Sequence, residues 1–500
     1  MQRSRAPAIM HTRVLLVLAL ALSLRLRPAR GLDNGVGRTP PLGWNTWCVD
    51  GQCARDYCTA AEVKETADII VSTGLRELGW THINLDDCWG WNRSAGGEYQ
   101  ADPTRFPPAA DGTPGMKVMA DYLHQRGLKF GLYTDGGKFT CSKGQRPFQI
   151  PGSYGHWEQD ARTFASWTMD YIKMDWCNSG TERPEAAYKN MSAALNATGR
   201  EMYFLACEWG VDAPWQWMRQ YANAWRATGD HFDYWGSTAG VIEQIAGVAE
   251  YGGCKADSFG CGWNYADFIM TGGAGCADGK PGSRCPGMTD TEYITEATLW
   301  TMAASPLIVA TDLRNMSAVQ RKVLFNRELL RIHQDPLALP GGRVATWSCS
   351  SSTAVAAGAT ASRRLAEKSE PTYPPSVQCP GDHNYCNLTA GGGGWGHCAR
   401  PDEAGGPHNP RNLCYVPLCQ IWARKLAGGE KAVALYNADN VRHNITVQFH
   451  VLGWPEATKV ELLDVWGNAT RGSFSQQFSS AVEPHGVVLL RATKLKTNEV

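Results

Sequence analysis

Short apolar segments alternate with stretches of helical periodicity from Pro41 to about Leu313. Short apolar runs predict buried strands, whereas apolar residues spaced three or four positions apart predict amphipathic helices. Eight segments fit strands: Leu42–Trp47, His82–Asp87, Lys129–Asp135, Tyr171–Trp176, Met202–Trp209, Ala224–Asp230, Trp263–Met270 and Pro306–Leu313. Eight strand–helix units in series predict a (β/α)8 barrel of the α/β class, to which we assign residues 32–340.

Helix signals lie between these strands. Thr59 and Glu62 form a capping-box pair, after which Val63, Ala67 and Ile70 repeat at helical spacing. Four further segments have a similar pattern: Met119–Arg126, Trp157–Trp167, Ala186–Leu195 and Glu292–Ala304. Helices therefore alternate with strands, as a barrel requires.

The pattern changes after Asp335-Pro336, where helical periodicity fades. Short strands are predicted at Gln420–Asn437, Ile445–Val451, Thr458–Trp466 and Val487–Leu490. They indicate a C-terminal antiparallel β-sandwich domain, assigned to residues 341–500. A cysteine- and glycine-rich stretch at about 348–415 interrupts it and has the composition of a disulfide-stapled insertion, holding Cys349, Cys379, Cys386, Cys398 and Cys414.

Residues 1–31 have the pattern of a secretory signal peptide. Arginines precede an apolar core at Val14–Leu24, which is too short to span a bilayer, and no later run is long and apolar enough to do so. Seventeen cysteines fit an oxidising compartment. Seven glycosylation sequons agree with this location: Asn92, Asn190, Asn196, Asn315, Asn387, Asn444 and Asn468. We expect a secretory-pathway protein, extracellular or in a lysosome or vacuole.

Composition and charge exclude several classes. Hydrophobic residues make up 43% of the chain and charged residues 19%, which argues against disordered, collagen-like and coiled-coil proteins. The first 31 residues contain six arginines and no acidic residue, so the remainder carries 42 basic and 48 acidic side chains. This net negative charge makes nucleic acid an unexpected partner.

Polar and aromatic side chains gather where the predicted strands end. They are Trp47, Asp86, Asp87, Tyr133, Lys173, Asp175, Cys207, Glu208, Trp209, Arg226, Asp230, Asp267 and Asp312. One aspartate after a strand is more often a helix N-cap. Because the carboxyl ends of barrel strands converge on one face, so many strand ends together predict a shared site.

The residue types at this face favour glycoside hydrolysis. The sequence contains no paired Cys-X-X-Cys motifs of a zinc site and no Gly-X-Ser-X-Gly elbow, so we expect neither a metal nor a cofactor. Paired carboxylates with aromatic neighbours suit a reaction in which one carboxylate attacks a sugar and another donates a proton.

Lys173 and Asp175 lie two positions apart and so share one face of a strand. A neighbouring ammonium group favours the ionised carboxylate that a nucleophile requires. Asp230 ends another strand, and repulsion from an ionised Asp175 would keep a proton on Asp230 for use as an acid. A purely structural Lys173–Asp175 ion pair is the alternative.

At these residues the chain closely resembles glycoside hydrolase family 27, the retaining α-galactosidases (melibiases) and α-N-acetylgalactosaminidases of eukaryotes. The resemblance runs from about Thr39 to Leu337 and continues more weakly through Gln420–Thr493. Its motifs are Pro41–Trp47, Asn84–Trp89, Gly131–Asp135, Tyr171–Cys177, Cys207–Gly210, Trp225–Asp230 and Gln334–Pro336.

The resemblance implies a role for each matching residue. Asp175 would be the nucleophile and Asp230 the acid/base. Asp86 and Asp87 would bind the galactose 4- and 6-hydroxyls, Lys173 the 3- and 4-hydroxyls, and Arg226 the region of the 2-hydroxyl. The resemblance also assigns Trp47 and Tyr133 to the pocket lining and pairs Cys141 with Cys177 beside it.

Two segments bear on specificity. Asp267 matches the second aspartate of a family motif, Trp-Asn-Asp-Pro-Asp-Met, that here reads Trp263-Asn-Tyr-Ala-Asp267-Phe-Ile, with Phe268 forming the pocket wall. The surrounding loop also gains four cysteines, Cys254, Cys261, Cys276 and Cys285. Cys207, Glu208 and Trp209 are bulky where the N-acetylgalactosaminidases carry small residues, which favours an α-galactoside substrate. Since 17 cysteines cannot all pair, Cys207 is a candidate free thiol, and a disulfide at Cys207 is the alternative.

Other functions stay open at this point. A related enzyme could be an α-N-acetylgalactosaminidase or a β-L-arabinopyranosidase, although the intact Asp86-Asp87 pair argues against the second. A galactose-binding lectin would be expected to lose Asp175 or Asp230, and a structural glycoprotein would not explain the strand-end residues. The natural galactoside and the oligomeric state, a homodimer included, also stay open.

Overall fold

The computed structural model describes residues 34–47, 58–142, 149–181, 183–255, 260–273, 287–349 and 418–495, with the backbone of short strands at 355–356, 386–387 and 397–398. Residues 1–31 and most of the 348–415 stretch lie outside this described part, so the predictions made for them are not addressed.

Eight parallel strands form the barrel. They are β1 (Leu42–Asn45), β2 (Trp80–Asn84), β5 (Lys129–Asp135), β6 (Tyr171–Asp175), β7 (Tyr203–Ala206), β8 (Ala224–Arg226), β10 (Cys261–Tyr265) and β11 (Leu307–Val309). From β1 to β10, each strand pairs with the next one in this series, and β11 pairs with β1. A parallel bridge between Ile269, which follows β10, and Val309 of β11 closes the barrel. The (β/α)8 barrel prediction is confirmed.

Helices cover the outside of the barrel. They are α2 (Ala60–Ser72), α3 (Gly115–His124), α4 (Trp157–Ser166), α5 (Pro184–Ala197), α6 (Trp235–Val248), α7 (Asp290–Met302), α8 (Ala318–Leu324) and α9 (Arg327–His333). The capping box at Thr59 and Glu62 is present, and α2 buries the predicted stripe of Val63, Ala67 and Ile70. The sequence analysis did not identify α6, α8 and α9 as helices.

Smaller elements decorate the barrel. Two strands, β3 (Gly90–Arg93) and β4 (Tyr99–Ala101), form a hairpin after β2, and β9 (Gly253–Cys254) pairs antiparallel with β10. Short 3-10 turns of the barrel lie at η2 (Arg76–Leu78), η3 (Pro214–Gln216), η4 (Met218–Gln220) and η5 (Ala249–Tyr251), and two more, η7 (Ala427–Gly429) and η8 (Phe449–Leu452), belong to the C-terminal domain.

The C-terminal region is a β-sandwich. Its larger sheet contains β12 (Gly342–Ser348), β13 (Val355–Ala356), β16 (Leu418–Lys425), β17 (Lys431–Asn437), β19 (Lys459–Asp464), β20 (Ala469–Ser475) and β22 (Val487–Lys494). A second sheet of β18 (His443–Gln448) and β21 (Gln477–Val482) packs against it across a core that includes Leu435, Val447 and Phe478. A separate short pair, β14 (Cys386–Asn387) and β15 (His397–Cys398), lies in the insertion.

The single strand predicted at Gln420–Asn437 is wrong. This segment forms β16 and β17, joined by a turn in which Gly428 has a φ of 73°. Two glycines and two charged residues at 428–431 interrupt the apolar pattern, and the strand on each side of them is buried in the sheet.

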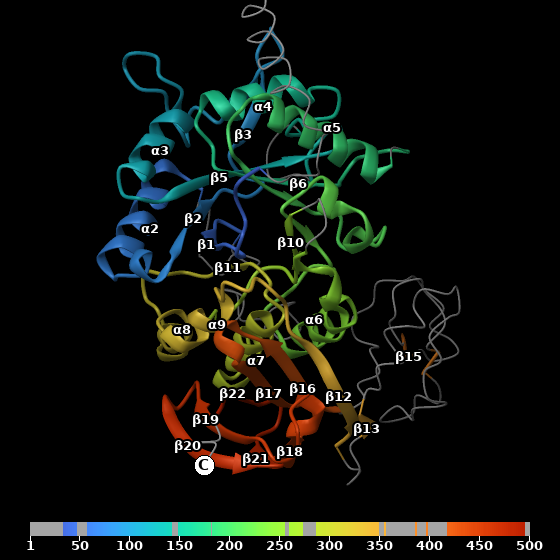
Figure 1. Cartoon of the computed structure of the whole chain (residues 1–500). Helices are drawn as coiled ribbons and strands as arrows, with labels where there is room; N and C mark the ends of the chain where they lie inside the picture. Colours follow the sequence, from blue (N-terminus) through green and yellow to red (C-terminus); the bar gives the residue numbers. More distant parts are fainter. Residues whose placement is uncertain are drawn as a thin grey trace, which may run out of the picture.

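The sandwich docks against α7, α8 and α9 below the barrel (Figure 1). Arg424 of β16 is buried at this contact and donates to the backbone oxygens of Leu339 (2.8 Å), Thr301 (2.6 Å) and His333 (3.1 Å). The two domains therefore share a packed and hydrogen-bonded interface.

The described residues contain four disulfides: Cys58–Cys88, Cys141–Cys177, Cys254–Cys261 and Cys349–Cys419. The pairing of Cys141 with Cys177 and the free, buried thiol of Cys207 are confirmed. Within the described part of the chain, no helix is both long and apolar enough to cross a bilayer.

Candidate active site

Asp175 is the last residue of β6, where parallel pairing on both sides buries the strand. Its Oδ1 accepts a hydrogen bond of 3.0 Å from the Trp176 amide, and the side chain is buried at the carboxyl end of the barrel. In the β5–β6 ladder it lies opposite Asp135, so two carboxylates occupy neighbouring strand ends.

Lys173 makes its ion pair with Asp86 across the barrel. Its Nζ lies 3.0 Å from Asp86 Oδ2 and 5.2 Å from the ring centres of Tyr133 and Phe268. The Lys173–Asp175 ion pair considered above is therefore replaced by Lys173–Asp86. This contact unites the ends of β2 and β6 and leaves the Asp175 carboxylate without a direct cationic partner in the described structure.

Burial raises the pKa of Asp175 to about 7, and the charges of Asp230 and Asp86 add to this effect. The charges of Lys173 and Arg226 lower the pKa of the same group but do not outweigh burial. The expected influence of Lys173 is thus present in direction, but burial outweighs it and disfavours the ionised form of Asp175 that a nucleophile requires.

Arg226, the last residue of β8, organises the opposite side of the site. Its buried guanidinium lies 3.0 Å from Asp230 Oδ1 and 3.1 Å from Asp267 Oδ2. Its Nη1 lies 3.5 Å from the sulfur of Cys207. Asp230 keeps 58% of its side chain exposed, whereas Asp267 and Cys207 are buried. The acids expected at the ends of β8 and β10 are therefore brought together by one arginine.

Asp87 lies beside the Cys141–Cys177 disulfide. Its Oδ2 accepts a hydrogen bond of 2.8 Å from the Ser142 amide, which follows Cys141. Burial raises the pKa of Asp87 to about 6, although hydrogen bonds from Ser142 and Thr140 oppose this effect. The disulfide thus connects the loop that binds Asp87 to the end of the Asp175 strand.

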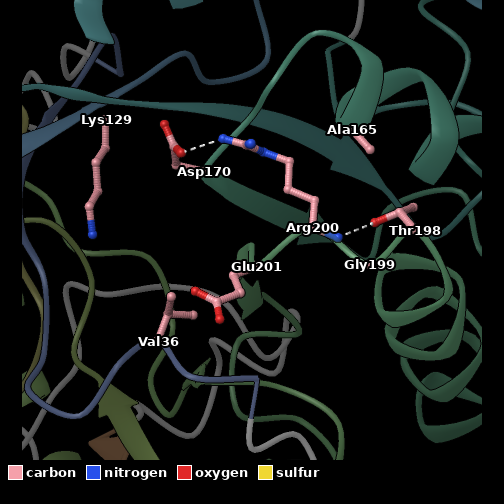
Figure 2. A pocket seen from close by; sticks show the side chains of 8 residues that line it. All are labelled: Val36, Lys129, Ala165, Asp170, Thr198, Gly199, Arg200 and Glu201. Atoms are coloured by element: carbon pink, nitrogen blue, oxygen red, sulfur yellow. Dashed lines mark hydrogen bonds and ion pairs between the residues drawn. The ribbon is translucent and has the colours of Figure 1, made fainter.

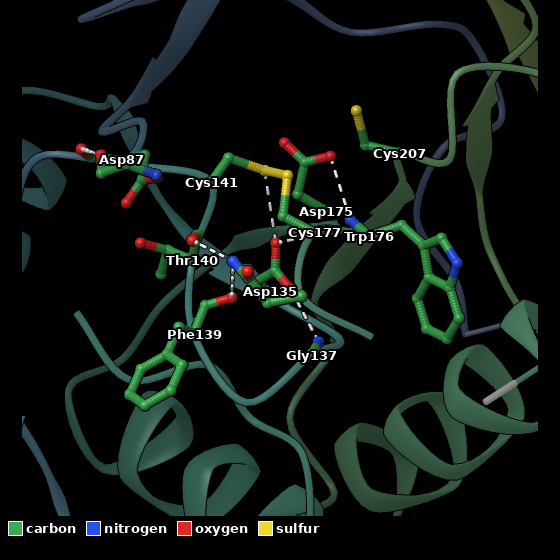
Figure 3. Close-up of a disulfide and its surroundings, with 12 residues drawn as sticks. Asp87, Asp135, Gly137, Phe139, Thr140, Cys141, Asp175, Trp176, Cys177 and Cys207 are labelled. Atoms are coloured by element: carbon green, nitrogen blue, oxygen red, sulfur yellow. Dashed lines mark hydrogen bonds between the residues drawn. A yellow bond between two sulfur atoms is a disulfide. The ribbon is translucent and has the colours of Figure 1, made fainter. Parts of the chain in front are cut away.

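Asp135 belongs to this cluster, and the sequence analysis missed it. Its carboxylate accepts hydrogen bonds from the amides of Gly137 (2.6 Å) and Cys177 (3.0 Å), and it points toward the disulfide in Figure 3. Burial, and next the charge of Asp175, raise the pKa of Asp135 well above its usual range. Its place at the end of β5, within a motif already singled out, was the signal that could have identified it.

Several buried polar atoms have no hydrogen-bond partner among the described residues. They include Tyr133 Oη, Arg226 Nε and Asp267 Oδ1. Buried polar groups are normally paired, so these atoms indicate a face that a polar ligand completes. Each belongs to a residue that the sequence analysis placed at the site.

Three predicted residues differ from this group. Glu208 is buried and its Oε2 accepts from the Asp212 amide at 3.3 Å, so it faces its own loop, while the neighbouring Cys207 faces Arg226. Trp209 follows with a left-handed φ of 56°, and Trp47 is 43% exposed at the rim after β1. The other carboxylate oxygen of Glu208, Oε1, is buried without a hydrogen-bond partner among the described residues.

Asp312, another strand-end acid, is paired with Arg314 at 2.7 Å.

The described residues contain two groups of three side chains whose possible metal-binding atoms lie within 4.8 Å of one another. One group is Asp135, Cys141 and Cys177, and the other is Cys349, Asp439 and His443. Every cysteine in them belongs to a disulfide and offers no thiolate, so we propose no metal site.

A cavity of about 600 Å³ lies at the other end of the barrel, beside the residues that precede or begin β5, β6 and β7 (Figure 2). Its lining includes Lys129, Glu201 and the Asp170–Arg200 ion pair of 2.7 Å. It is therefore separate from the carboxyl-end cluster.

A (β/α)8 barrel with carboxylates, a lysine and an arginine converging at its carboxyl face is typical of glycoside hydrolases. The family described as Alpha galactosidase A matches residues 39–335, and the Alpha galactosidase C-terminal beta sandwich domain matches residues 418–492. The chain belongs to the Alpha galactosidase A family.

Individual relatives agree with this assignment. The chain is 36% identical over 459 residues to an alpha-galactosidase of Oryza sativa, with 91% of this chain and 85% of the relative covered. It is 33% identical over 455 residues to an alpha-galactosidase of Coffea arabica, with 91% and 93% covered. The solved structure of alpha-galactosidase I from Mortierella vinacea has a TM-score of 0.67 and 26% identity, over 92% of this chain and 98% of that one.

Proposed function

We propose that this protein is a retaining α-galactosidase that removes terminal α-D-galactosyl residues from oligosaccharides, galactomannans or glycolipids. The observation that carries the proposal is the meeting of Asp175 and Asp230 with Arg226 and the Lys173–Asp86 ion pair at one barrel face. The family of the chain and the names of its relatives support the same activity.

The reaction proceeds by double displacement. The Asp175 carboxylate attacks the anomeric carbon, the bond from that carbon to the leaving oxygen breaks, and Asp230 transfers its proton to this oxygen. A covalent galactosyl ester of Asp175 results. Asp230 then takes a proton from water, which attacks the anomeric carbon and releases α-galactose together with free Asp175.

The remaining residues bind the sugar. Asp86 and Asp87 accept hydrogen bonds from the 4- and 6-hydroxyls, and Lys173 donates to the 3- and 4-hydroxyls. Arg226 and Asp267 face the 2-hydroxyl side, where Cys207 fills the space that a 2-acetamido group would need. The unpartnered atoms of Tyr133, Arg226 and Asp267 support this arrangement, since hydroxyl groups would satisfy them.

A turnover assay tests the activity. Purified protein is given p-nitrophenyl α-galactoside, the corresponding α-N-acetylgalactosaminide and β-L-arabinopyranoside, in buffer with no metal or cofactor added. We expect turnover of the galactoside, and preference for either other substrate would replace the proposal with that related activity. Galactose binding without turnover would indicate a lectin.

Proton NMR of the first-formed sugar tests retention. The proposed mechanism predicts α-galactose before mutarotation, because two inversions restore the original configuration. Initial β-galactose would contradict the covalent mechanism.

We also propose that residues 1–31 are a secretory signal, followed by the barrel at 32–340 and the sandwich at 341–500. All six sequon asparagines in the described residues are exposed: Asn92, Asn190, Asn196, Asn315, Asn444 and Asn468. Their exposure and the four disulfides support passage through the secretory pathway. A mass decrease on enzymatic removal of N-glycans from the protein expressed in eukaryotic cells is the expected result.

A further inference from the structure

The segment after β10 forms one wall of the site and has an unfavourable backbone conformation. Asp267 has a φ of 76°, in the left-handed region that non-glycine residues rarely adopt. Phe268 follows and presents its ring 5.2 Å from Lys173 Nζ. Such a conformation persists only where surrounding contacts fix it.

His231 supplies two of those contacts and directly follows Asp230 in the chain. Its backbone amide donates to Asp267 Oδ2 at 2.9 Å, and its ring Nδ1 donates to the Phe268 carbonyl oxygen at 2.8 Å. Trp300 of α7 adds a hydrogen bond of 2.9 Å to the Asp267 carbonyl oxygen. His231 therefore fastens the loop that carries Asp230 to the wall that carries Asp267 and Phe268.

The tautomer of His231 follows from its partners. The Phe268 carbonyl can only accept, so Nδ1 must carry the proton. Nε2 then accepts from the hydroxyl of Thr238 on α6, at 2.8 Å. Burial lowers the pKa of His231 to about 4, which agrees with a neutral ring that uses both nitrogens in fixed directions. The ring thus joins α6 to the wall of the site.

The conformation of this loop matters because Asp230 itself is weakly held. Its side chain is 58% exposed, and the contact described for it is the one with Arg226. The direction of its carboxyl group consequently depends on the backbone of its own loop. On one side, the amide of Gly229 donates to the side chain of Gln244 on α6 at 3.3 Å, while His231 on the other side connects the loop to the site.

We propose that His231 is a positioning residue for the proposed acid/base, holding Asp230 at the angle required for proton transfer to the leaving oxygen. The inference rests on the proposed function and assigns this chain a contributor that lies outside the sugar-binding residues. The proposal predicts a specific effect of losing His231. A misdirected acid slows the cleavage of substrates with poor leaving groups far more than that of substrates with activated leaving groups.

The test compares His231→Phe with His82→Phe. His82 is also buried on the barrel, donates from Nδ1 to the Leu42 carbonyl oxygen at 3.3 Å, and has a pKa lowered by burial to about 4, but it lies away from the carboxyl-end cluster. Both variants keep a buried ring and lose its hydrogen bonds. For each, kcat/KM is measured with melibiose and with 2,4-dinitrophenyl α-galactoside, and both values are compared with wild type.

For His231→Phe we expect the loss with melibiose to exceed the loss with the dinitrophenyl substrate by about tenfold or more, up to the roughly 10²–10⁴-fold that complete loss of acid/base assistance would cost. His82→Phe should reduce kcat/KM for the two substrates by the same factor, because a smaller fraction of folded protein lowers both values equally. Equal losses in His231→Phe would overturn the proposal.

Thr238→Val provides a second, milder variant, because it removes the hydroxyl bound to Nε2 and leaves the ring in place. It should also lose more kcat/KM with melibiose than with the dinitrophenyl substrate, but by a smaller factor, and it tests the proposal if His231→Phe does not fold. A larger loss with melibiose supports a positioning role for His231. Equal losses with the two substrates, or no loss, contradict it. Wild-type protein that cleaves neither substrate would instead contradict the proposed function.

Discussion

At the residue scale, the two proposed catalytic carboxyls have different surroundings. Asp175 is buried in a strand end beside Lys173 and Asp86, whereas Asp230 is largely exposed and paired with Arg226. A fixed, enclosed carboxylate suits attack on a bound sugar, while an exposed one can reach a leaving group and a water molecule. The two roles proposed above follow this difference in surroundings.

Asp175→Ala should abolish turnover of every α-galactoside, because no covalent intermediate can form. Asp230→Ala should spare the first step for aryl galactosides, whose leaving groups need little protonation, and the covalent intermediate should then accumulate. Mass spectrometry of the quenched protein would detect the added galactosyl mass in Asp230→Ala and not in Asp175→Ala.

Azide separates the two roles further, because this anion attacks without a general base. Asp230→Ala should be accelerated and yield an α-galactosyl azide, because azide replaces water in the second of two inverting steps, with a gain within the roughly 10²–10⁴-fold range of acid/base assistance. Asp175→Ala has no covalent intermediate, so azide that rescues it attacks the α-galactoside directly and yields a β-azide by a single inversion. An α-azide from Asp175→Ala together with a β-azide from Asp230→Ala would mean that the roles are reversed.

The pH dependence of activity follows from the carboxyl pair. The proposed roles require an ionised Asp175 and a protonated Asp230 in the same molecule, so kcat/KM should fall at both ends of the pH range and have its optimum below neutrality. The acid limb reports protonation of the nucleophile Asp175, whose pKa burial raises above the usual range of a carboxyl group. A kcat/KM profile from pH 3 to 9 measures this, and an optimum above neutrality would contradict the proposed roles.

Residue identities at the site could be predicted from the sequence, but their pairing could not. The strand-end positions of Asp86, Lys173, Asp175 and Arg226 follow from the hydrophobic pattern. That Lys173 contacts Asp86 rather than Asp175 depends on how side chains from β2 and β6 meet across the barrel interior. Linear spacing contains no such information.

At the element scale, the eight strands were predictable because buried parallel strands are short, apolar and regularly spaced. Apart from β5, which ends at Asp135 as predicted, their ends were predicted too late in the chain: β8, for example, ends at Arg226, and the residues through Asp230 form a loop. Helix α6 was missed because it is apolar on most sides, with Ala239, Val241, Ile242 and Ile245 all buried. A helix buried this widely lacks the one-sided stripe that periodicity detects.

Arg424 of β16 provides a test of how the elements of the two domains are joined. Arg424→Met keeps most of the side-chain volume but removes the donors to the backbone oxygens of Leu339, Thr301 and His333. We expect a loss of about 2–4 kcal/mol in the free energy of unfolding, because the carbonyl groups of Leu339 and His333 lose this donor while that of Thr301 keeps the Ala304 amide. Calorimetry should show a lower unfolding temperature or two separate transitions.

Arg442→Ala is the matched control in the same domain. Arg442 pairs with Glu483 at 3.1 Å, but both side chains are at least 60% exposed, so the loss should stay below about 1 kcal/mol. Equal effects of the two substitutions would contradict the role of Arg424 at the interface.

At the scale of the whole molecule, buried titratable groups far apart in the fold give stability a common pH dependence. Burial raises the pKa of Glu208 and of Glu296 to about 8, which disfavours their ionised forms in the folded state. Burial lowers the pKa of His82 and His231 to about 4 and of His333 to about 3. The two sets act in opposite directions and over different pH ranges.

The folded state binds the glutamate protons up to about pH 8, whereas the unfolded chain loses them near pH 4.5, so their contribution declines as pH rises between these values. The histidines oppose this decline only below about pH 6.5, where the unfolded chain protonates them. Above pH 6.5 the histidines no longer oppose the decline, and the buried aspartates with raised pKa values, which include Asp175 and Asp135, act in the same direction as the glutamates. Stability should therefore fall from pH 6.5 to 8 by about 1.4 kcal/mol per pH unit for each proton concerned. Chemical unfolding at several pH values measures this slope.

Glu296→Gln tests the assignment, because glutamine keeps an acceptor for the Met270 amide and a donor for the Thr271 hydroxyl but cannot ionise. This variant should reduce the slope of the free energy of unfolding against pH by the contribution of one proton. Glu461→Gln, on the exposed face of β19, should leave the slope unchanged. An unchanged slope in Glu296→Gln would contradict this account.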